Sequence, residues 1–175
     1  LARRDEPRPL DALIREDVAR VRAVRDAVGE AAAIYIDANC SLDHLHAVRL
    51  AQMLEPYDIA FFEEPITQND VPLMADMRRR TRIALACGQN EGLGFRFRDL
   101  IAAQAVDVIQ PNVAITGGIT QCARIAGMAQ CANVPIANGG AWPFHNMHLH
   151  AGLAHGGLVE YHMVAVLMSE VIYRG

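Results

Sequence analysis

The chain has 175 residues, 52% of them hydrophobic, so it can bury one sizeable core and fits a single domain over residues 1–175. Its net charge of −4 argues against a nucleic-acid partner, and no apolar run reaches the roughly 18 residues of a membrane helix. All sixteen basic residues are Arg, so these residues alone cannot complete a mechanism that uses a lysine. The four cysteines are widely spaced without a C-x-x-C pair, which predicts free thiols and a cytoplasmic protein.

Short apolar segments rich in Ile, Val and Phe alternate along the chain with segments of helical character. We expect helices over residues 11–28, from Ser41 or Asp43 to 53, from Asn69 or Asp70 to 80, and over 117–132. The expected strands occupy residues 33–37, 59–63, 83–87, 106–110, 134–137 and 158–161.

The near-constant spacing of these strands, about 25 residues, is typical of the repeating unit of a (β/α)₈ barrel. Strands that are apolar without strict alternation fit a parallel sheet buried on both faces. Because six units are visible, the sequence predicts part of a TIM-type α/β barrel. A doubly wound open sheet is the alternative.

Each expected strand ends in a carboxylate or amide side chain. The carboxyl ends of barrel strands form one rim, where barrel enzymes place their active sites. Asp37, Glu63 and Gln89 follow one another at 26-residue intervals and so occupy equivalent places on three neighbouring strands. Two carboxylates and an amide oxygen suit a hard cation such as Mg²⁺. Taken singly, each is also an ordinary turn or cap residue.

Several motifs at these strand ends resemble one known family. They are Asp37-Ala38-Asn39, Phe62-Glu63-Glu64-Pro65, Gly88-Gln89-Asn90-Glu91, Gln110-Pro111-Asn112 with Thr116-Gly117-Gly118, and Val159-Glu160-Tyr161. Together they resemble the barrel domain of the enolase superfamily, in its mandelate racemase and muconate lactonising branch. The resemblance implies strands three to eight of the barrel. It also implies that the capping domain, two earlier strands and a C-terminal return segment lie outside these residues.

The resemblance further implies an enzyme that binds Mg²⁺, holds a substrate carboxylate on the metal and removes the α-proton to give an ene-diolate. Dehydration of a sugar acid is the expected reaction. Cycloisomerisation or racemisation within the same superfamily, and a non-catalytic barrel that binds acid sugars, are the alternatives. The expected partner is a small carboxylate, and we expect the full-length protein to be a homo-oligomer.

Three departures from the family pattern concern the site. The third metal ligand is usually a Glu directly after the glycine, where this chain has Gln89, so either Gln89 or Glu91 completes the set. The Asp of the usual Asp–His dyad falls at Asn112, and the His falls at residues 138–140, which hold no imidazole. No Lys-x-Lys supplies the other usual base.

Histidines after the seventh expected strand are the candidate replacements for the missing base. His145 is the first candidate for general acid or base, and His148 lies one turn on. Trp142 and His148 are candidate substrate contacts, although helix capping and packing explain these side chains as well. Glu160 corresponds to the family acid that hydrogen-bonds the substrate carboxylate, a role that needs a protonated side chain; an ionised turn residue is the alternative. The resemblance adds Asn112 to the catalytic set, and the substrate-binding set also includes Asn39, Glu64 and Asn138.

Overall fold

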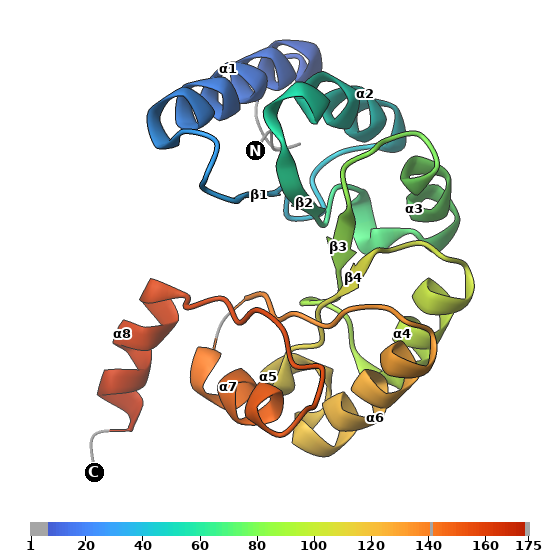
Figure 1. The fold of residues 1–175 in the computed structure, drawn as a ribbon, viewed down its shortest axis with the longest axis vertical. Coiled ribbons are helices and arrows are strands. Elements are labelled where there is room, and N and C mark those ends of the chain that lie inside the picture. The colour runs from blue at the N-terminus through green and yellow to red at the C-terminus, as the bar shows by residue number, and fades with distance from the viewer. Residues whose placement is uncertain (1–6, 141, 174–175) are drawn as a thin grey trace. The chain divides into compact units, whose positions relative to one another are not determined.

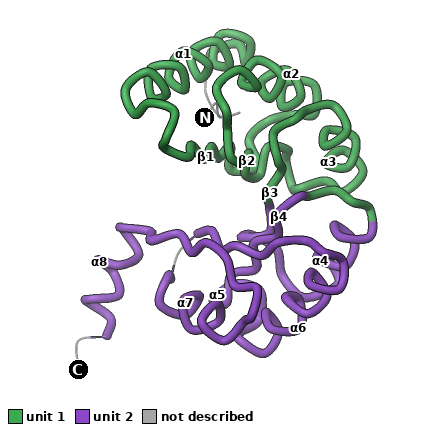
Figure 2. Tube along the Cα trace, in the orientation of Figure 1, with its two compact units in different colours: residues 1–86, 103–106 green, residues 87–102, 107–175 purple. Residues whose placement is uncertain are grey.

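The computed structural model describes residues 7–140 and 142–173. Their contacts divide the chain into two compact units, residues 1–86 with 103–106 and residues 87–102 with 107–175 (Figure 2). None of the described helices is both long and apolar enough to cross a membrane.

The first unit alternates helices with strands of a parallel sheet. In chain order it contains α1 (Leu10–Val28), β1 (Ile34–Asp37), α2 (His44–Leu54), a 3₁₀ turn (Glu55–Tyr57), β2 (Ile59–Glu63), a second 3₁₀ turn (Thr67–Asn69), α3 (Val71–Arg78) and β3 (Leu85–Cys87). The last residue of β3 belongs to the second unit. Figure 1 shows α1, α2 and α3 side by side on one side of β1 and β2, and these helices contact one another in sequence.

Local chemistry sets the helix ends in this unit. Asp43 and Asp70 each accept the backbone N–H of the third residue of α2 and α3, which satisfies an otherwise unpaired donor at the helix start. Arg25, in the last turn of α1, donates to four backbone carbonyls, those of Gly29, Ala32, Tyr57 and Asp58, at 2.7–3.0 Å. One guanidinium therefore holds the end of α1 to the segments that lead into β1 and β2.

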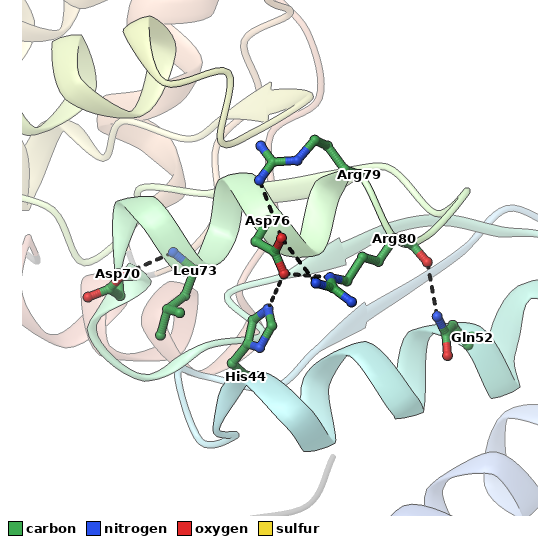
Figure 3. Close-up of polar contacts among 7 residues, drawn as sticks. All are labelled: His44, Gln52, Asp70, Leu73, Asp76, Arg79 and Arg80. Atoms are coloured by element: carbon green, nitrogen blue, oxygen red, sulfur yellow. Dashed lines mark hydrogen bonds and ion pairs between the residues drawn. The ribbon is translucent and has the colours of Figure 1, made fainter.

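A polar cluster also joins α2 to α3 (Figure 3). The Asp76 carboxylate accepts from Arg80 Nε at 2.5 Å and lies 2.9 Å from His44 Nε2. The side-chain amide of Gln52, through Nε2, donates to the Arg80 carbonyl at 3.2 Å. The hydrogen bond from Arg80, with the nearby charges of Arg80, His44 and Arg79, lowers the pKa of Asp76.

The second unit contains the remaining helices of the described residues and the strand β4. In chain order these elements are α4 (Leu93–Ala102), β4 (Val108–Ile109), the short α5 (Val113–Thr116), α6 (Gly118–Cys131), α7 (Pro143–Ala151) and α8 (Met163–Ile172). Its core is formed by fully or almost fully buried apolar side chains of α4, β4, α6 and the segment after α6: Phe97, Ile109, Ile125, Ala126, Ala129 and Ile136. Burial of the thiol in this unit's interior raises the pKa of Cys122 to about 11.

The strands run parallel in the order β1-β2-β3-β4, which confirms the barrel-type α/β fold. A doubly wound sheet would place non-consecutive strands beside each other. The prediction of full strands was wrong for the last two expected strands. Residues 134–137 and 158–161 contribute only the isolated parallel bridges Ile109↔Ile136 and Asn138↔Val159, and the sheet of the described residues is not closed.

The structure also contains helices that the sequence patterns did not predict. These are α4, α5 and α8. In α4 the glycines at 92 and 94 obscure the helical pattern, and burial of Phe97 and Leu100 outweighs the weak helix propensity.

Candidate functional site

In the first unit, the two predicted carboxylate ligands lie side by side. Parallel pairing of β1 with β2 places Asp37 opposite Glu63, each at the last residue of its strand. The pairing continues past the strand ends, where the Ala38 N–H donates to the Glu63 carbonyl at 3.1 Å. The backbone therefore brings two carboxylates to one edge, as their equal spacing in the sequence predicted.

Asn39 and Glu64, both predicted substrate contacts, have local protein partners. The backbone and side-chain N–H groups of Asn39 donate to the two oxygens of Asp37 at 2.6 and 2.9 Å, which fixes the orientation of that carboxylate. Glu64 is fully buried and accepts from Asn69 Nδ2 at 3.0 Å. In this structure Asn39 thus orients a candidate ligand, and Glu64 is packed inside the first unit.

In the second unit, three predicted residues converge on the loop Gly139-Gly140. Asn112 Nδ2 and Asn138 Nδ2 both donate to the Gly139 carbonyl, at 3.0 and 2.9 Å. The Gly140 N–H donates to Glu160 Oε2 at 2.5 Å. Residues from the ends of three successive expected strands therefore share one short loop, which forms the centre of the site in this unit.

Gln89 lies against the same loop. A Cβ on Gly140 would be 2.7 Å from Gln89 Oε1 and 3.1 Å from Asn112 Nδ2, and Gly140 has a φ of +81°. Only glycine combines that left-handed backbone with so little space. Gln89, 7% exposed, is thus held against the glycine loop of the second unit.

Glu91, the alternative third ligand, is already in an ion pair. Arg96 donates to both of its carboxylate oxygens, from Nε at 2.8 Å and from Nη2 at 3.3 Å. That hydrogen bond and the charge of Glu91 raise the pKa of Arg96. A carboxylate held by a bidentate guanidinium is less free to bind a cation.

Asn112 is built into the scaffold. Its Oδ1 accepts from the Ala114 N–H at 3.0 Å and caps α5, while its Nδ2 holds the Gly139 carbonyl. Asn146, which the sequence analysis did not select, is also fully buried and accepts from the Val113 N–H at 2.8 Å. Its Nδ2 donates to the Trp142 carbonyl at 3.2 Å. These two amides connect α5, α7 and the glycine loop, and a buried Asn inside a helix was the signal that could have identified Asn146.

The two candidate histidines line a groove between α7 and α8. The groove has a volume of about 810 Å³ and is lined by Phe144, His145, His148, Ser169, Glu170 and Tyr173. The rings of His145 and Tyr173 lie 6.2 Å apart. His145 Nδ1 is buried and has no hydrogen-bond partner among the described residues. Trp142, half-buried with a φ of +68°, precedes the first turn of α7.

The predicted metal ligands, Asp37, Glu63 and Gln89, offer oxygen donors, which suit a hard cation. Within residues 7–140 and 142–173, no three His, Cys, Asp or Glu side chains lie close enough together to hold a metal ion. The sequence prediction uses two carboxylates and one amide oxygen instead, all oxygen donors of the kind that Mg²⁺ prefers.

Comparison with known proteins identifies the family. Residues 7–174 match the family described as "Enolase C-terminal domain-like", and the chain belongs to this family. A solved mandelate racemase/muconate lactonizing enzyme from a marine actinobacterium, in complex with magnesium, is 33% identical with a TM-score of 0.78, over 83% of this chain and 41% of that one. The predicted superfamily and branch are therefore confirmed.

Two relatives with assigned activities are also similar. The arabinonate dehydratase of Saccharolobus solfataricus is 30% identical over 163 residues, 91% of this chain and 43% of the relative. The 3,6-anhydro-alpha-L-galactonate cycloisomerase of Streptomyces coelicolor is 29% identical over 138 residues, 79% of this chain and 37% of the relative. The chain thus spans less than half the length of the proteins it matches.

Proposed function

We propose that this chain carries the metal-binding residues of a Mg²⁺-dependent enzyme that dehydrates a sugar acid. The observation that carries the proposal is the register of β1 with β2, which pairs Asp37 with Glu63 at adjacent strand ends. The similarity to an arabinonate dehydratase supports the substrate class. In such a reaction the α C–H and the β C–O bonds break, water leaves, and the resulting enol tautomerises to a 2-keto-3-deoxy acid.

Asp37, Glu63 and Gln89 are the proposed metal ligands. When bound, Mg²⁺ supplies a Lewis acid that stabilises negative charge on the substrate carboxylate. Asn39 holds the Asp37 carboxylate in one orientation, so less ordering is needed when the cation binds. The ion pair between Arg96 and Glu91 supports Gln89, rather than Glu91, as the proposed third donor.

The remaining residues of the proposed site hold the substrate and move protons. Glu160, whose carboxylate accepts the Gly140 N–H, is the proposed contact of the substrate carboxylate. His145, with its unpartnered Nδ1, is the proposed general acid or base. Trp142, Asn138 and His148 are proposed contacts of the sugar chain. Asn112 positions the glycine loop, since its amide cannot take up a proton as a carboxylate would.

The test measures Mg²⁺ binding and keto-acid formation by the full-length protein. We expect Asp37→Asn and Glu63→Gln each to weaken Mg²⁺ binding at least about tenfold and to abolish turnover, because each removes an anionic ligand. Gln89→Glu is expected to keep or tighten Mg²⁺ binding. Glu91→Gln is the matched control and is expected to leave Mg²⁺ affinity unchanged. Unaltered Mg²⁺ affinity in all four variants would overturn the metal site.

Cycloisomerisation is a second candidate, favoured by the absence of an acidic residue at position 112. That reaction needs one base, whereas racemisation needs two on opposite faces. Incubation with arabinonate and with 3,6-anhydro-alpha-L-galactonate distinguishes the two reactions by their products. Mg²⁺ binding without turnover of any sugar acid would favour the non-catalytic binding protein.

A further inference from the structure

His150, near the end of α7, makes one defined hydrogen bond from a buried position. It is 8% exposed, and its Nδ1 accepts the Gly157 N–H at 3.1 Å. Because Nδ1 accepts, the proton of the neutral ring is on Nε2. Nε2 is buried, and no partner for it occurs in the described part of the chain. A buried N–H without a partner is unfavourable.

The two glycines beside His150 leave no space for side chains. A Cβ on Gly156 would lie 2.3 Å from the His150 carbonyl oxygen, and a Cβ on Gly157 would lie 2.1 Å from the Ile136 carbonyl oxygen. The backbone at 156–157 is therefore pressed between the last turn of α7 and the segment that precedes the glycine loop. Small movements of this backbone are transmitted to both neighbours.

The residues that follow Gly157 lead directly to Glu160. The Asn138 N–H donates to the Leu158 carbonyl at 2.8 Å, and the Glu160 N–H donates to the Asn138 carbonyl at 3.0 Å. The Glu160 carboxylate then accepts the Gly140 N–H. A continuous set of hydrogen bonds thus runs from the His150 ring to the carboxylate of the proposed site.

We propose that His150 is a positioning residue: its neutral ring holds the Gly157 N–H and thereby fixes the segment that presents Glu160 to the substrate. This inference rests on the proposed function for the role of Glu160. His150 touches no substrate in this scheme and acts through Gly157. The same bond makes the segment sensitive to protonation, because a protonated ring carries a hydrogen on Nδ1 and cannot accept from Gly157.

The surroundings of His150 favour the neutral ring. Burial lowers the pKa of His150, and the nearby His155 lowers it further. From α6, which packs against α7, the titratable groups are the exposed Arg124, the buried thiol of Cys122 and the exposed Cys131. The residues of α5 include no titratable group, and α7 itself adds His145 and His148.

The test measures amide hydrogen exchange of residues 157–160 in the full-length protein and three variants. His150→Asn keeps an acceptor near the position of Nδ1, His150→Gln places one near Nε2, and His150→Leu has none. We expect His150→Leu and His150→Gln to lose protection about fivefold to tenfold at these amides, the effect of one hydrogen bond, with α6 unchanged. His150→Asn is expected to stay within about twofold of the unmodified protein.

A titration of the unmodified protein gives a result that does not depend on whether a variant folds. Protection at Gly157, corrected for intrinsic exchange, should fall as the pH drops below the ordinary His value of 6.5, and His150→Asn should abolish this pH dependence. Protection that is independent of pH in the unmodified protein, or equal loss in the Asn and Leu variants, would overturn the proposal.

Activity then separates this proposal from the proposed function. With an active enzyme, the Leu variant should raise KM for the sugar acid and the Asn variant should restore it. If the protein dehydrates no sugar acid, the exchange data still decide whether His150 fixes the 157–160 segment. If exchange is unaffected while turnover persists, His150 has no positioning role.

Discussion

Gly140 is the residue at which the strand-end side chains meet, and its environment is the most restrictive in the proposed site. Its left-handed φ and the 2.7 Å approach of Gln89 Oε1 act together. Any side chain here has to displace Gln89 or the loop. The close contact therefore links the position of a proposed metal ligand to the conformation of one glycine.

We expect Gly140→Ala to destabilise the protein by about 3 kcal/mol, combining left-handed strain with overpacking, and to reduce Mg²⁺ affinity. Gly118→Ala is the matched control, because Gly118 has a φ of +85° with nothing within 4 Å of its Cβ position. That control should cost only the strain, about 1–2 kcal/mol. Urea unfolding measures both free energies, and equal losses in the two variants would contradict the crowding at Gly140.

Residue identities in the site were predictable where the chemistry depends on spacing. The position of Asp37 beside Glu63 was predictable because equal intervals between strands place the two residues in register. The ion pair of Glu91 with Arg96 was not predictable, because the position of Arg96 follows from the unpredicted helix α4. Asn146 was missed for a similar reason, since its partner N–H belongs to α5, another helix that lacked a clear sequence signal.

At the scale of elements, Arg25 is the main polar connection between the end of α1 and the segments before β1 and β2. We expect Arg25→Lys to lower the free energy of unfolding by about 2 kcal/mol, since one ammonium cannot reach all four carbonyls that the planar guanidinium contacts. Arg22→Lys on the same helix is the control, because Arg22 is exposed and its ion pair with Asp26 is long, at 3.7 Å. Chemical denaturation should show no change for the control.

The Asp76 cluster predicts a specific loss of stability in acid. Because its pKa lies below the ordinary 3.8 in the folded state, the ionised carboxylate contributes stability that is present above pH 3.8 and is lost as the pH falls through the lowered value. Asp76→Asn should destabilise the protein at pH 7 and remove this part of the acid dependence.

Asp26→Asn, at an exposed carboxylate on α1, is the control for the Asp76 variant. Urea midpoints at pH 7 and at pH 3 compare the two variants with the unmodified protein. Identical pH dependence in Asp76→Asn and in the unmodified protein would rule out a role of the α2–α3 cluster in acid stability.

The elements themselves were predicted unevenly. Helices with an Asp cap and apolar residues at helical spacing, such as α2 and α3, were found nearly to the residue. Residues 134–137 and 158–161 have the composition of strands but pair only through single bridges. A strand needs a neighbour along its length, and composition contains no information about that neighbour.

For the whole molecule, α8 exposes an unusual amount of apolar surface. The exposed apolar side chains of this helix, each half or more accessible, are Met163, Val164, Leu167, Met168, Val171 and Ile172. Removal of such an apolar surface from water is favourable, so the 175-residue chain should associate as its concentration rises. The open edge of β1 within the described sheet adds a second site for association.

We expect the double variant Leu167→Glu and Val171→Glu to reduce association measured by light scattering. Leu45→Glu is the control, because Leu45 is 72% exposed but lies on α2, away from this apolar face in the sequence. Equal scattering in the double variant and the unmodified chain would contradict a role of α8. The fold class was predictable at this scale because regular spacing of strands reports topology, whereas the exposure of α8 depends on packing.

The loop that carries the glycine centre also holds the chain's single tryptophan. Trp142 lies between Gly140 and the first turn of α7, and its carbonyl is held by Asn146. In the 175-residue chain, tryptophan fluorescence therefore arises from this loop, with no label and no second indole. We expect the emission of this indole to change when a ligand binds at the loop, which gives an optical signal before any assay of chemistry.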